Sequence, residues 1–505
     1  MKKKKETSLS KSKYLAGLQC LKRLYLKCHQ PELAGEADEA SQSILNQGTE
    51  VGQLAREYFK GGILVEHDYM HHKEALLKTQ KLIKSGDTPA IFEAAFTYKN
   101  INIRIDVLKR LPRNQWHIVE VKSSAEIKEE HLPDIAIQKY VAEKCGLRIS
   151  KVSHMHINRD YVYDGKKIDL KKLFTIDDVK KDITEVGKTI PKNLTKQRKV
   201  LVSHKPPCIE AGSQCGKPVE CEFYWHCNED LEDDWIGNLP RINQDKIELL
   251  LEDNIESILD IPEDFPLTVI QKRAQMCVKK GKPYFGKDLV AVINKLKFPM
   301  YFMDFETANP AIPRYRGMQP YDHIPFQWSI HTLVNVNKNS VHHEFLHTED
   351  NDPREPFIKS LLEVLEKNNR APILVYYQSF ELGRLTDIAK WFPKYARRIE
   401  AIKKRVCDLW VIVSKNVYHP EFYGSFSIKC VLPALVKGMS YEGMDIADGL
   451  QASASYNNLV NGDLTKRQRQ KIIKDLLKYC CQDTLAMVKL YEWLKKEAQK
   501  LAKSK

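Results

Sequence analysis

Three charged residues, Asp106, Glu120 and Lys122, have the types and spacing of a metal-dependent phosphodiesterase site. They fall in two alternating apolar runs around a polar turn at residues 111–114, which predicts a β-hairpin over residues 101–122. Glu120 and Lys122 share a strand face, and strand pairing brings Asp106 to the same end of the sheet. The two carboxylates can coordinate Mg2+ or Mn2+, which polarises a phosphate and a water, while the lysine stabilises developing negative charge. A surface hairpin with solvated charges is the alternative, since this D-x13-E-x-K pattern is loose.

A second group of acidic residues lies in the C-terminal part of the chain. Asp304 and Glu306 end a predicted buried strand that starts at Met300, and Tyr479 and Asp483 lie one turn apart on a predicted helix. These side chains can hold two metal ions roughly 3.5–4 Å apart, with the tyrosine orienting the attacking water. A buried strand whose acids only cap the sheet is the alternative interpretation.

A third acid is expected to join this second group from the middle of the same region. Glu381 ends the run Val-Tyr-Tyr-Gln-Ser-Phe-Glu, which begins in a strand predicted at residues 372–377. Asp408, in Cys-Asp-Leu-Trp, is the alternative third acid. Glutamate can ligate a metal, but its longer side chain shifts the geometry, and geometry governs rate.

Cysteines form a third candidate centre. Cys215, Cys221 and Cys227 follow a C-x5-C-x5-C spacing in a loop-like segment, and Cys20 offers a fourth thiolate. Four thiolates suit zinc or an iron–sulfur cluster, and spacing alone does not distinguish the two. Cys28 and Cys208 are the spare cysteines that compete for a place in this set.

Hydrophobic periodicity predicts the elements that position these residues. Gln138 falls in an amphipathic helix, where it can orient the water or Lys122. Helices are expected at residues 14–25, 44–58, 131–145 and 471–500, and strands at 90–99, 151–164, 300–306 and 326–334. Residues 242–280 are predicted to be helical with a break at 260–262. A turn at 250–255 has a weak likeness to helix-hairpin-helix motifs, and ordinary helical packing is the favoured interpretation.

Composition limits the class of protein. The chain has 505 residues, a formal net charge of +14 and 12 cysteines, and no apolar run is long enough to span a membrane. We therefore expect a cytoplasmic protein with reduced thiols and a polyanionic partner. Solubility alone is the other explanation for the charge. The predicted divisions are a basic disordered tail (1–12), a first α/β domain with the cysteines (13–228), a helical linker (229–296) and a second α/β domain (297–505).

The first α/β domain resembles the PD-(D/E)XK nucleases of the RecB type, especially their iron–sulfur CRISPR-associated and AddB-like branches. The resemblance rests on SKSKYLAGLQCLKRLYL, IDVL, EVK and DIAIQKY, and covers roughly residues 10–227. It implies a restriction-endonuclease-like fold with Asp106 and Glu120 as metal ligands, Lys122 as the catalytic lysine and Gln138 as the helix glutamine. These nucleases often carry a histidine or glutamate on an earlier helix, and Glu50 is the candidate for it here. They also carry a tyrosine some residues after the glutamine, and in this sequence that tyrosine is displaced to Tyr140. The resemblance also implies a 4Fe–4S cluster that fastens the ends of the domain; its ligands would be Cys20, Cys215, Cys221 and Cys227.

The second α/β domain resembles the DEDD exonucleases of the DnaQ type, over about residues 298–501. The resemblance rests on D-x-E-T at a strand end and Y-x3-D in the last helix. It implies an RNase H-like fold and 3′–5′ exonuclease chemistry, with Asp304, Glu306, Glu381 and Asp483 as metal ligands and Tyr479 as the catalytic tyrosine. This sequence departs from the pattern at the middle motif, where the usual Asn and Asp are missing.

The order of the two domains, with PFQWSIH and GSFSIK, resembles an uncharacterised bacterial family with this fused layout. We therefore expect a metal-dependent nuclease with two sites, acting on single-stranded DNA or DNA with free ends in repair, recombination or defence. Two alternatives stay open: a nucleic-acid clamp with one or both sites inactive, and an RNA-processing exonuclease.

Overall fold

The structure, a computed structural model, describes residues 8–35, 39–66, 71–229, 231–335 and 338–503. The chain is a mixed α/β protein, as predicted, and it divides into two compact units. The N-terminal unit comprises Met1–Asp230 with Pro310–Asp322, and the C-terminal unit comprises Leu231–Asn309 with His323–Lys505.

The N-terminal unit is organised around a sheet of order β2-β3-β4-β5-β6-β7, with β1 paired to the start of β4. Its strands are β1 (Leu9–Ser10), β2 (Ile63–Leu64), β3 (Ala90–Tyr98), β4 (Ile101–Leu111), β5 (Gln115–Val121), β6 (Arg148–Ile157) and β7 (Phe174–Asp178). Strand β5 alternates between two apolar clusters, since Trp116 and Ile118 pack in one and Val119 in the other.

Helices cover both faces of this sheet. One apolar cluster includes side chains of α1 (Lys11–Gln19), α2 (Leu21–His29), α4 (His72–Ser85), α5 (His131–Lys144) and α7 (Asp182–Leu201). The other includes α3 (Glu39–Tyr58) and α6 (Leu170–Leu173). The predicted helix at 14–25 is in fact two helices, because the backbone is extended at Cys20.

The predicted hairpin over residues 101–122 is confirmed. Strands β4 and β5 pair antiparallel, with Val107 opposite Val119. Arg113 and Asn114 in the turn have φ of 59° and 54°, the left-handed pair that matches the twist of a tight hairpin.

The C-terminal unit contains a five-stranded sheet of order β11-β10-β9-β12-β13. Strands β9, β10 and β11 are antiparallel neighbours, and β12 runs parallel to both β9 and β13. The strands are β9 (Met300–Ala308), β10 (Ile324–Leu333), β11 (Val341–Leu346), β12 (Ile373–Val375) and β13 (Val406–Asp408).

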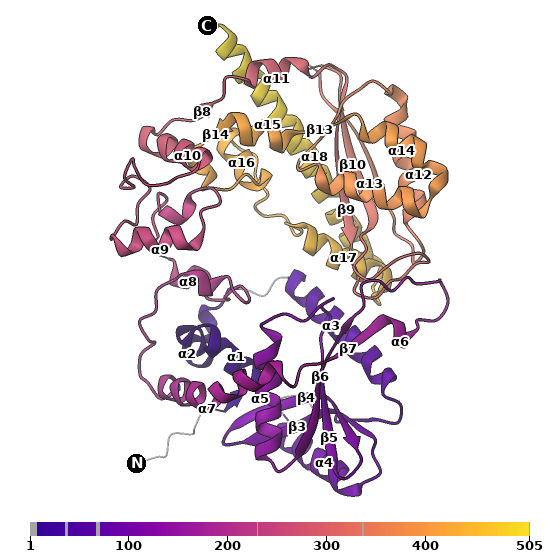
Figure 1. The fold of residues 1–505 in the computed structure, drawn as a ribbon. Helices are drawn as coiled ribbons and strands as arrows, with labels where there is room; N and C mark the ends of the chain where they lie inside the picture. Colours follow the sequence, from indigo (N-terminus) through magenta and orange to yellow (C-terminus); the bar gives the residue numbers. More distant parts are fainter. Residues whose placement is uncertain (1–7, 36–38, 67–70, 230, 336–337, 504–505) are drawn as a thin grey trace. The chain divides into compact units, whose positions relative to one another are not determined.

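The two faces of this sheet carry different helices (Figure 1). On one face lie α12 (Arg354–Leu365), α13 (Ser379–Trp391) and α14 (Ala396–Lys403), and on the other α17 (Gly449–Asn461) and the long α18 (Lys466–Lys503). Met303 and Phe305 of β9 pack on the α12 side, whereas Phe302 packs on the α18 side. Alternation therefore directs Asp304 and Glu306 toward α18.

Three predicted divisions differ from the structure. Of the tail expected at 1–12, residues 1–7 lie outside the described residues, but Leu9 is buried in β1 and Lys11 begins α1. The segment 229–296 is not a separate linker, because Leu250 and Cys277 pack in the same core as Phe302 of β9. Its helices are α9 (Gln244–Glu252), α10 (Val269–Lys280) and α11 (Leu289–Lys295).

The turn at 250–255 is present, with Asn254 at φ 58°, but no second helix follows it directly. The helix-hairpin-helix interpretation is therefore wrong. The residues Pro310–Asp322, predicted inside the second domain, belong to the N-terminal unit because Ala311 and Ile312 pack beside α3. None of the described helices combines the length and apolar character needed to cross a membrane.

Candidate active site and metal centres

Asp106, Glu120 and Lys122 lie together where β4 and β5 pair. The backbone N–H of Val121 donates a 2.7 Å hydrogen bond to Asp106 Oδ2, which fixes that carboxylate across the hairpin. Lys122 Nζ lies 2.7 Å from Glu120 Oε1. Gln138 Nε2, on α5, donates to Glu120 Oε2 at 2.6 Å. The structure thus groups the predicted residues of the first site into one hydrogen-bonded centre.

Two further residues join this centre, and sequence reasoning missed both. Asp134, on the first turn of α5, lies 2.6 Å from Lys122 Nζ. Lys11 Nζ lies 3.0 Å from both Glu120 Oε1 and Asp134 Oδ1. A signal for Asp134 existed, since it precedes Gln138 by four residues and shares its helix face. Lys11 has no local signal, because only the pairing of β1 with β4 delivers it to the carboxylates.

Burial and charge set the protonation of this centre. Burial and the negative charge of Glu120 raise the pKa of Asp106 to about 8. Burial opposes the charge on Lys122, but Glu120 and Asp134 outweigh it and hold the lysine pKa above its ordinary value. Despite burial, Lys11 and Lys122 hold the pKa of Asp134 well below its usual range. Asp106 is therefore the acid whose ionisation most needs an added cation.

Glu93 on β3 is a further carboxylate at this centre. Its φ of 55° lies in the left-handed region, which glutamate rarely adopts and which costs free energy. In the β3–β4 ladder Glu93 lies across from Asp106. The residue of α3 that approaches these acids is Arg56, at 3.6 Å from Glu93, whereas the expected helix acid Glu50 is exposed.

The four predicted cysteines, Cys20, Cys215, Cys221 and Cys227, line one pocket in the N-terminal unit. Cys20 lies in the extended connection between α1 and α2, and Cys227 ends the short helix α8 (Tyr224–Cys227). The spare cysteines lie elsewhere. Cys208 is exposed, and Cys28 packs against the large apolar core.

Polar contacts fasten the first helices to the cysteine loop. Gln19 Nε2 donates to the carbonyl oxygens of Gln214 and Val219 at 2.6 and 2.7 Å. Arg23 Nε donates to Glu222 Oε2 at 2.7 Å. Arg23 and Lys22 also line the cysteine pocket, and burial raises the pKa of the Cys221 thiol above its ordinary value.

The spacing of these four cysteines bears on which group they fit. A tetrahedral zinc ion with Zn–S bonds of about 2.3 Å places its sulfurs about 3.8 Å apart. In the described part of the chain, triplets of ligand side chains within 4.8 Å of one another occur at two other places, but not among these cysteines. Zinc and an iron–sulfur cluster both take four thiolates, and a cluster binds each of them through a different iron.

Replacement of one pocket cysteine tests this fit. Cys215→Ser removes one of four thiolates. We therefore expect the iron content of the anaerobically purified protein to fall from near stoichiometric to a small fraction of that amount. Iron and zinc per chain are measured by elemental analysis. Cys208→Ser is the matched control and should keep the metal content of the parent protein. Equal metal content in both variants would contradict the assignment of Cys215.

The acids of the C-terminal unit also converge. Asp304 comes from the middle of β9 and Glu306 from its second half, Glu381 from the first turn of α13, and Asp483 from α18. Burial, followed by the charge of Asp483, raises the pKa of Asp304 well above its ordinary value. The pKa of Glu306 is raised by burial and by Asp304 and Asp483, and that of Glu381 by burial and Asp304. Mutual repulsion of this kind marks a site suited to a cation.

The structure distinguishes the two candidates for the third acid. Asp408 accepts hydrogen bonds from the backbone N–H groups of Tyr377, Gln378 and Trp410 at 3.0, 3.0 and 2.9 Å. Its oxygens are therefore occupied in holding the turn between β12 and α13. Glu381 is 2% exposed, and its Oε2 is a buried oxygen for which the described residues supply no hydrogen-bond partner. Glu381 is thus the acid available to a ligand.

Two tyrosines and a lysine border these acids. Tyr441 Oη donates a 2.7 Å hydrogen bond to Asp483 Oδ1, and the Tyr479 hydroxyl also favours the ionised form of Asp483. Lys429 Nζ lies 5.7 and 5.8 Å from the ring centres of Tyr441 and Tyr479. Tyr479 was predicted. Tyr441 and Lys429 were missed, because neither lies at a fixed spacing from the acidic motifs.

The acid cluster predicts a pH-dependent stability. Burial raises the pKa of Asp483 from 3.8 to about 6, so its contribution to stability is complete below about pH 4 and is lost as pH rises through 6. We expect the melting temperature of EDTA-treated protein to fall over this interval. In Asp483→Asn, the free energy of unfolding should decrease by roughly 3 kcal/mol less over the same pH interval.

Added Mg2+ provides the control for this prediction. At pH 7 it should raise the melting temperature of the parent protein and leave that of Asp483→Asn nearly unchanged, since the asparagine lacks the charge that attracts a cation. An identical pH slope in both proteins, or no response of the parent protein to Mg2+, would contradict the interpretation.

An aromatic pocket of about 430 Å3 lies in the same unit as the acids. Its lining includes Arg241, Tyr376, Tyr377 and Trp410. Tyr377, four residues before Glu381, is 56% exposed and has a φ of 78°. Its ring packs edge-on against Trp410 at 5.6 Å between centroids, and Arg241 lies 5.5 Å from the Trp410 ring centre. Flat apolar faces with a guanidinium suit a stacked ring such as a nucleobase.

Comparisons with known proteins match parts of this chain. Residues 301–427 match the family model described as Domain of unknown function (DUF2779), a span that includes Asp304, Glu306 and Glu381 but ends before Asp483. The chain is similar to Uncharacterized protein UU173 of Ureaplasma parvum, at 25% identity over 227 residues, 41% of this chain and 33% of that protein. It is also similar to Uncharacterized protein MG366 of Mycoplasma genitalium, at 26% identity over 217 residues, which are 39% of this chain and 32% of that protein. The chain thus spans about a third of the length of these relatives.

Proposed function

We propose that the protein is a metal-dependent nuclease whose principal site is the acid centre of the C-terminal unit. One observation carries the proposal. Asp304, Glu306, Glu381 and Asp483, from three separate elements, meet at a buried point where their pKa values are raised and where Glu381 Oε2 has no described partner. An uncompensated cluster of buried carboxylates is costly unless cations bind it.

The side chains around this centre suit phosphodiester hydrolysis. Bound Mg2+ or Mn2+ supplies Lewis-acid polarisation of the phosphate and a more acidic water. In this proposal Tyr479 would hydrogen-bond the attacking water, and Tyr441 would keep Asp483 in one orientation through its 2.7 Å hydrogen bond. Lys429 adds the positive charge that a phosphate needs. These roles agree with an RNase H-like DEDD exonuclease domain, an assignment supported by the mixed sheet with α18 packed on one face.

The substrate class follows from charge and from the aromatic pocket. A net charge of +14 favours a polyanion, and the pocket lined by Tyr376, Tyr377 and Trp410 suits an unstacked base. Because bases in a duplex are already stacked, this pocket favours single-stranded DNA or a free end. Single-stranded RNA has the same phosphates and bases, so RNA processing is the alternative for this unit.

The N-terminal unit is proposed as a second, PD-(D/E)XK-type nuclease centre, with Asp106 and Glu120 as metal ligands and Lys122 as the catalytic lysine. The cysteine pocket would hold a 4Fe–4S cluster, with zinc as the alternative, joining α1 and α2 to the end of the unit. A nucleic-acid clamp is the second candidate for this unit. It is favoured by the ion pairs of Lys11 and Lys122 with Glu120 and Asp134, which satisfy these carboxylates without a metal.

A cleavage assay tests the proposed function. Anaerobically purified protein is incubated with end-labelled single-stranded DNA, duplex DNA and RNA, with Mg2+, Mn2+ or EDTA. We expect cleavage of single-stranded DNA that requires the divalent ion, and products that shorten stepwise from the 3′ end. Faster cleavage of RNA would select the RNA-processing alternative. Binding of all substrates without cleavage would select the clamp and overturn the nuclease proposal.

A further inference from the structure

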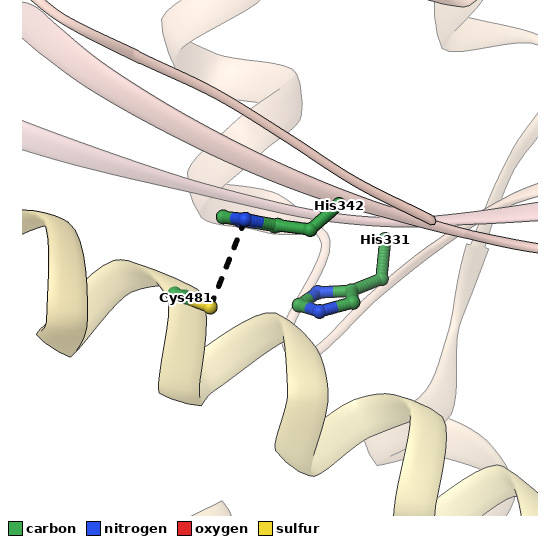
Figure 2. Close-up of side chains that lie close together, drawn as sticks. All are labelled: His331, His342 and Cys481. Atoms are coloured by element: carbon green, nitrogen blue, oxygen red, sulfur yellow. Dashed lines mark hydrogen bonds between the residues drawn. The ribbon is translucent and has the colours of Figure 1, made fainter. Parts of the chain in front are cut away.

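Three side chains with metal-ligand chemistry meet away from the acid centre, on the sheet of the C-terminal unit. His331 comes from β10, His342 from β11 and Cys481 from α18 (Figure 2). One ligand atom from each lies within 4.8 Å of the other two. Cys481 Sγ is 3.9 Å from His342 Nδ1, and Figure 2 shows the His331 ring beside this pair. The three residues are far apart in sequence, so only the fold brings them together.

Each histidine uses its other nitrogen for a hydroxyl partner. His331 Nδ1 lies 2.8 Å from Thr484 Oγ1, and His342 Nε2 lies 2.9 Å from Ser329 Oγ. These two hydroxyls are themselves 2.7 Å apart. Metal-binding histidines are held in this way, because a bond at one ring nitrogen fixes the tautomer and directs the other nitrogen to the metal.

We propose that His331, His342 and Cys481 bind one divalent transition-metal ion of the zinc type. A thiolate with two imidazoles is a ligand set that zinc prefers. With Zn–N bonds of about 2.0–2.1 Å and a Zn–S bond of about 2.3 Å, a tetrahedral site separates nitrogen and sulfur by about 3.6 Å. The observed 3.9 Å between His342 Nδ1 and Cys481 Sγ is close to this separation.

A fourth ligand is available from the same strand. Glu344 Oε2 lies 3.9 Å from His342 Nδ1, and Glu344 shares the strand face of His342 because it is two residues further along β11. A water can take this place instead. Burial lowers the pKa of His331 to about 4, so its imidazole is neutral and able to bind a metal at pH 7.

The expected effect of this ion is to fix α18 on the sheet. The site joins β10 and β11 to α18 at Cys481, two residues before Asp483. Cys480, the preceding residue, faces the acid centre instead, with its Sγ 3.9 Å from the carbonyl oxygen of Asp304. The two adjacent cysteines therefore border two different centres. The zinc-type site does not depend on the nuclease proposal, since a clamp with the same fold would keep it.

Metal stoichiometry tests the proposal. Full-length protein is produced with added zinc, and zinc and iron per chain are measured for the parent, Cys481→Ser and His342→Ala. We expect both variants to hold one equivalent of zinc less than the parent, with iron unchanged. As a second readout, Co2+ added to the parent should give a thiolate-to-cobalt absorption band that is absent from the Cys481→Ser difference spectrum.

Two controls separate this site from the other centres. His343→Ala changes the neighbouring histidine on the opposite strand face, and Cys145→Ser changes an exposed cysteine of the N-terminal unit. Both should keep the zinc content and cobalt band of the parent. Cys481→Ser decides the question if His342→Ala fails to fold. Equal zinc in the parent and Cys481→Ser, together with an unchanged cobalt spectrum, would overturn the proposal.

Discussion

Asp304→Asn is expected to lower the Mg2+-dependent hydrolysis of end-labelled single-stranded DNA by about 10^3-fold, because it removes a central carboxylate from the acid cluster. Metal-ion stabilisation of a phosphodiester transition state is worth several kcal/mol, and each 1.4 kcal/mol changes the rate about tenfold. The quantity to measure is kcat/KM in a Glu120→Gln background, so that cleavage by the N-terminal unit does not contribute.

The stability of the same variant distinguishes a lost ligand from a damaged fold. Because burial and Asp483 raise the pKa of Asp304, the neutral asparagine relieves repulsion and should leave the metal-free melting temperature equal or higher. Asp463→Asn, which neutralises an exposed acid, should keep both rate and melting temperature. A variant that loses activity and also melts several degrees lower would point to unfolding rather than to a missing metal ligand.

Lys122→Ala should abolish the second cleavage activity while leaving hydrolysis that depends on Asp304. The lysine is 27% exposed and lies 2.7 and 2.6 Å from Glu120 and Asp134. Its removal leaves Lys11 as the cation beside both carboxylates, so the loss of stability should be smaller than the roughly 3–5 kcal/mol that an unpaired buried charge costs. The measurement compares cleavage products and melting temperature of the variant with the parent.

Two companion variants make this second prediction specific. Lys139→Ala, on helix α5, which carries Asp134, removes an i,i+4 surface pair and should change neither quantity by much. Glu120→Gln keeps the size of the side chain and should lose the same activity with less loss of stability. If Lys122→Ala destabilises the unit yet every cleavage product remains, the N-terminal centre is a clamp rather than a nuclease.

Short-range patterns explain what the sequence could predict. Alternation and a polar turn were enough for the β4–β5 hairpin, because strand period and turn residues are local properties. The i,i+4 spacing put Tyr479 and Asp483 on one face of α18. The three regularly spaced cysteines and Cys20 line one pocket, as their expected common role requires.

Long-range pairing explains what the sequence could not predict. Lys11 reaches Glu120 and Asp134 because Leu9 pairs with Ile101 in β4, a contact over 90 residues away in the chain. Composition alone placed that segment in a disordered tail. Pro310–Asp322 joined the N-terminal unit through packing of small apolar side chains, which no periodicity marks.

The same limit applies to the sites. His331, His342 and Cys481 have no common sequence motif, since two strands and a helix contribute one residue each. Glu381 was the expected third acid and Asp408 its alternative, and no local pattern distinguished the two. The difference between them lies in the fold, where three backbone N–H groups donate hydrogen bonds to Asp408.

Cleavage by the double variant Asp304→Asn/Glu120→Gln tests the central claim most directly. Initial rates on single-stranded DNA are measured with Mn2+ and with EDTA, beside the parent protein and each single variant. Two metal-dependent centres predict that each single variant keeps part of the activity and that the double variant is as inactive as the parent in EDTA. Retention of the parent's rate by the double variant would contradict the assignment of both centres.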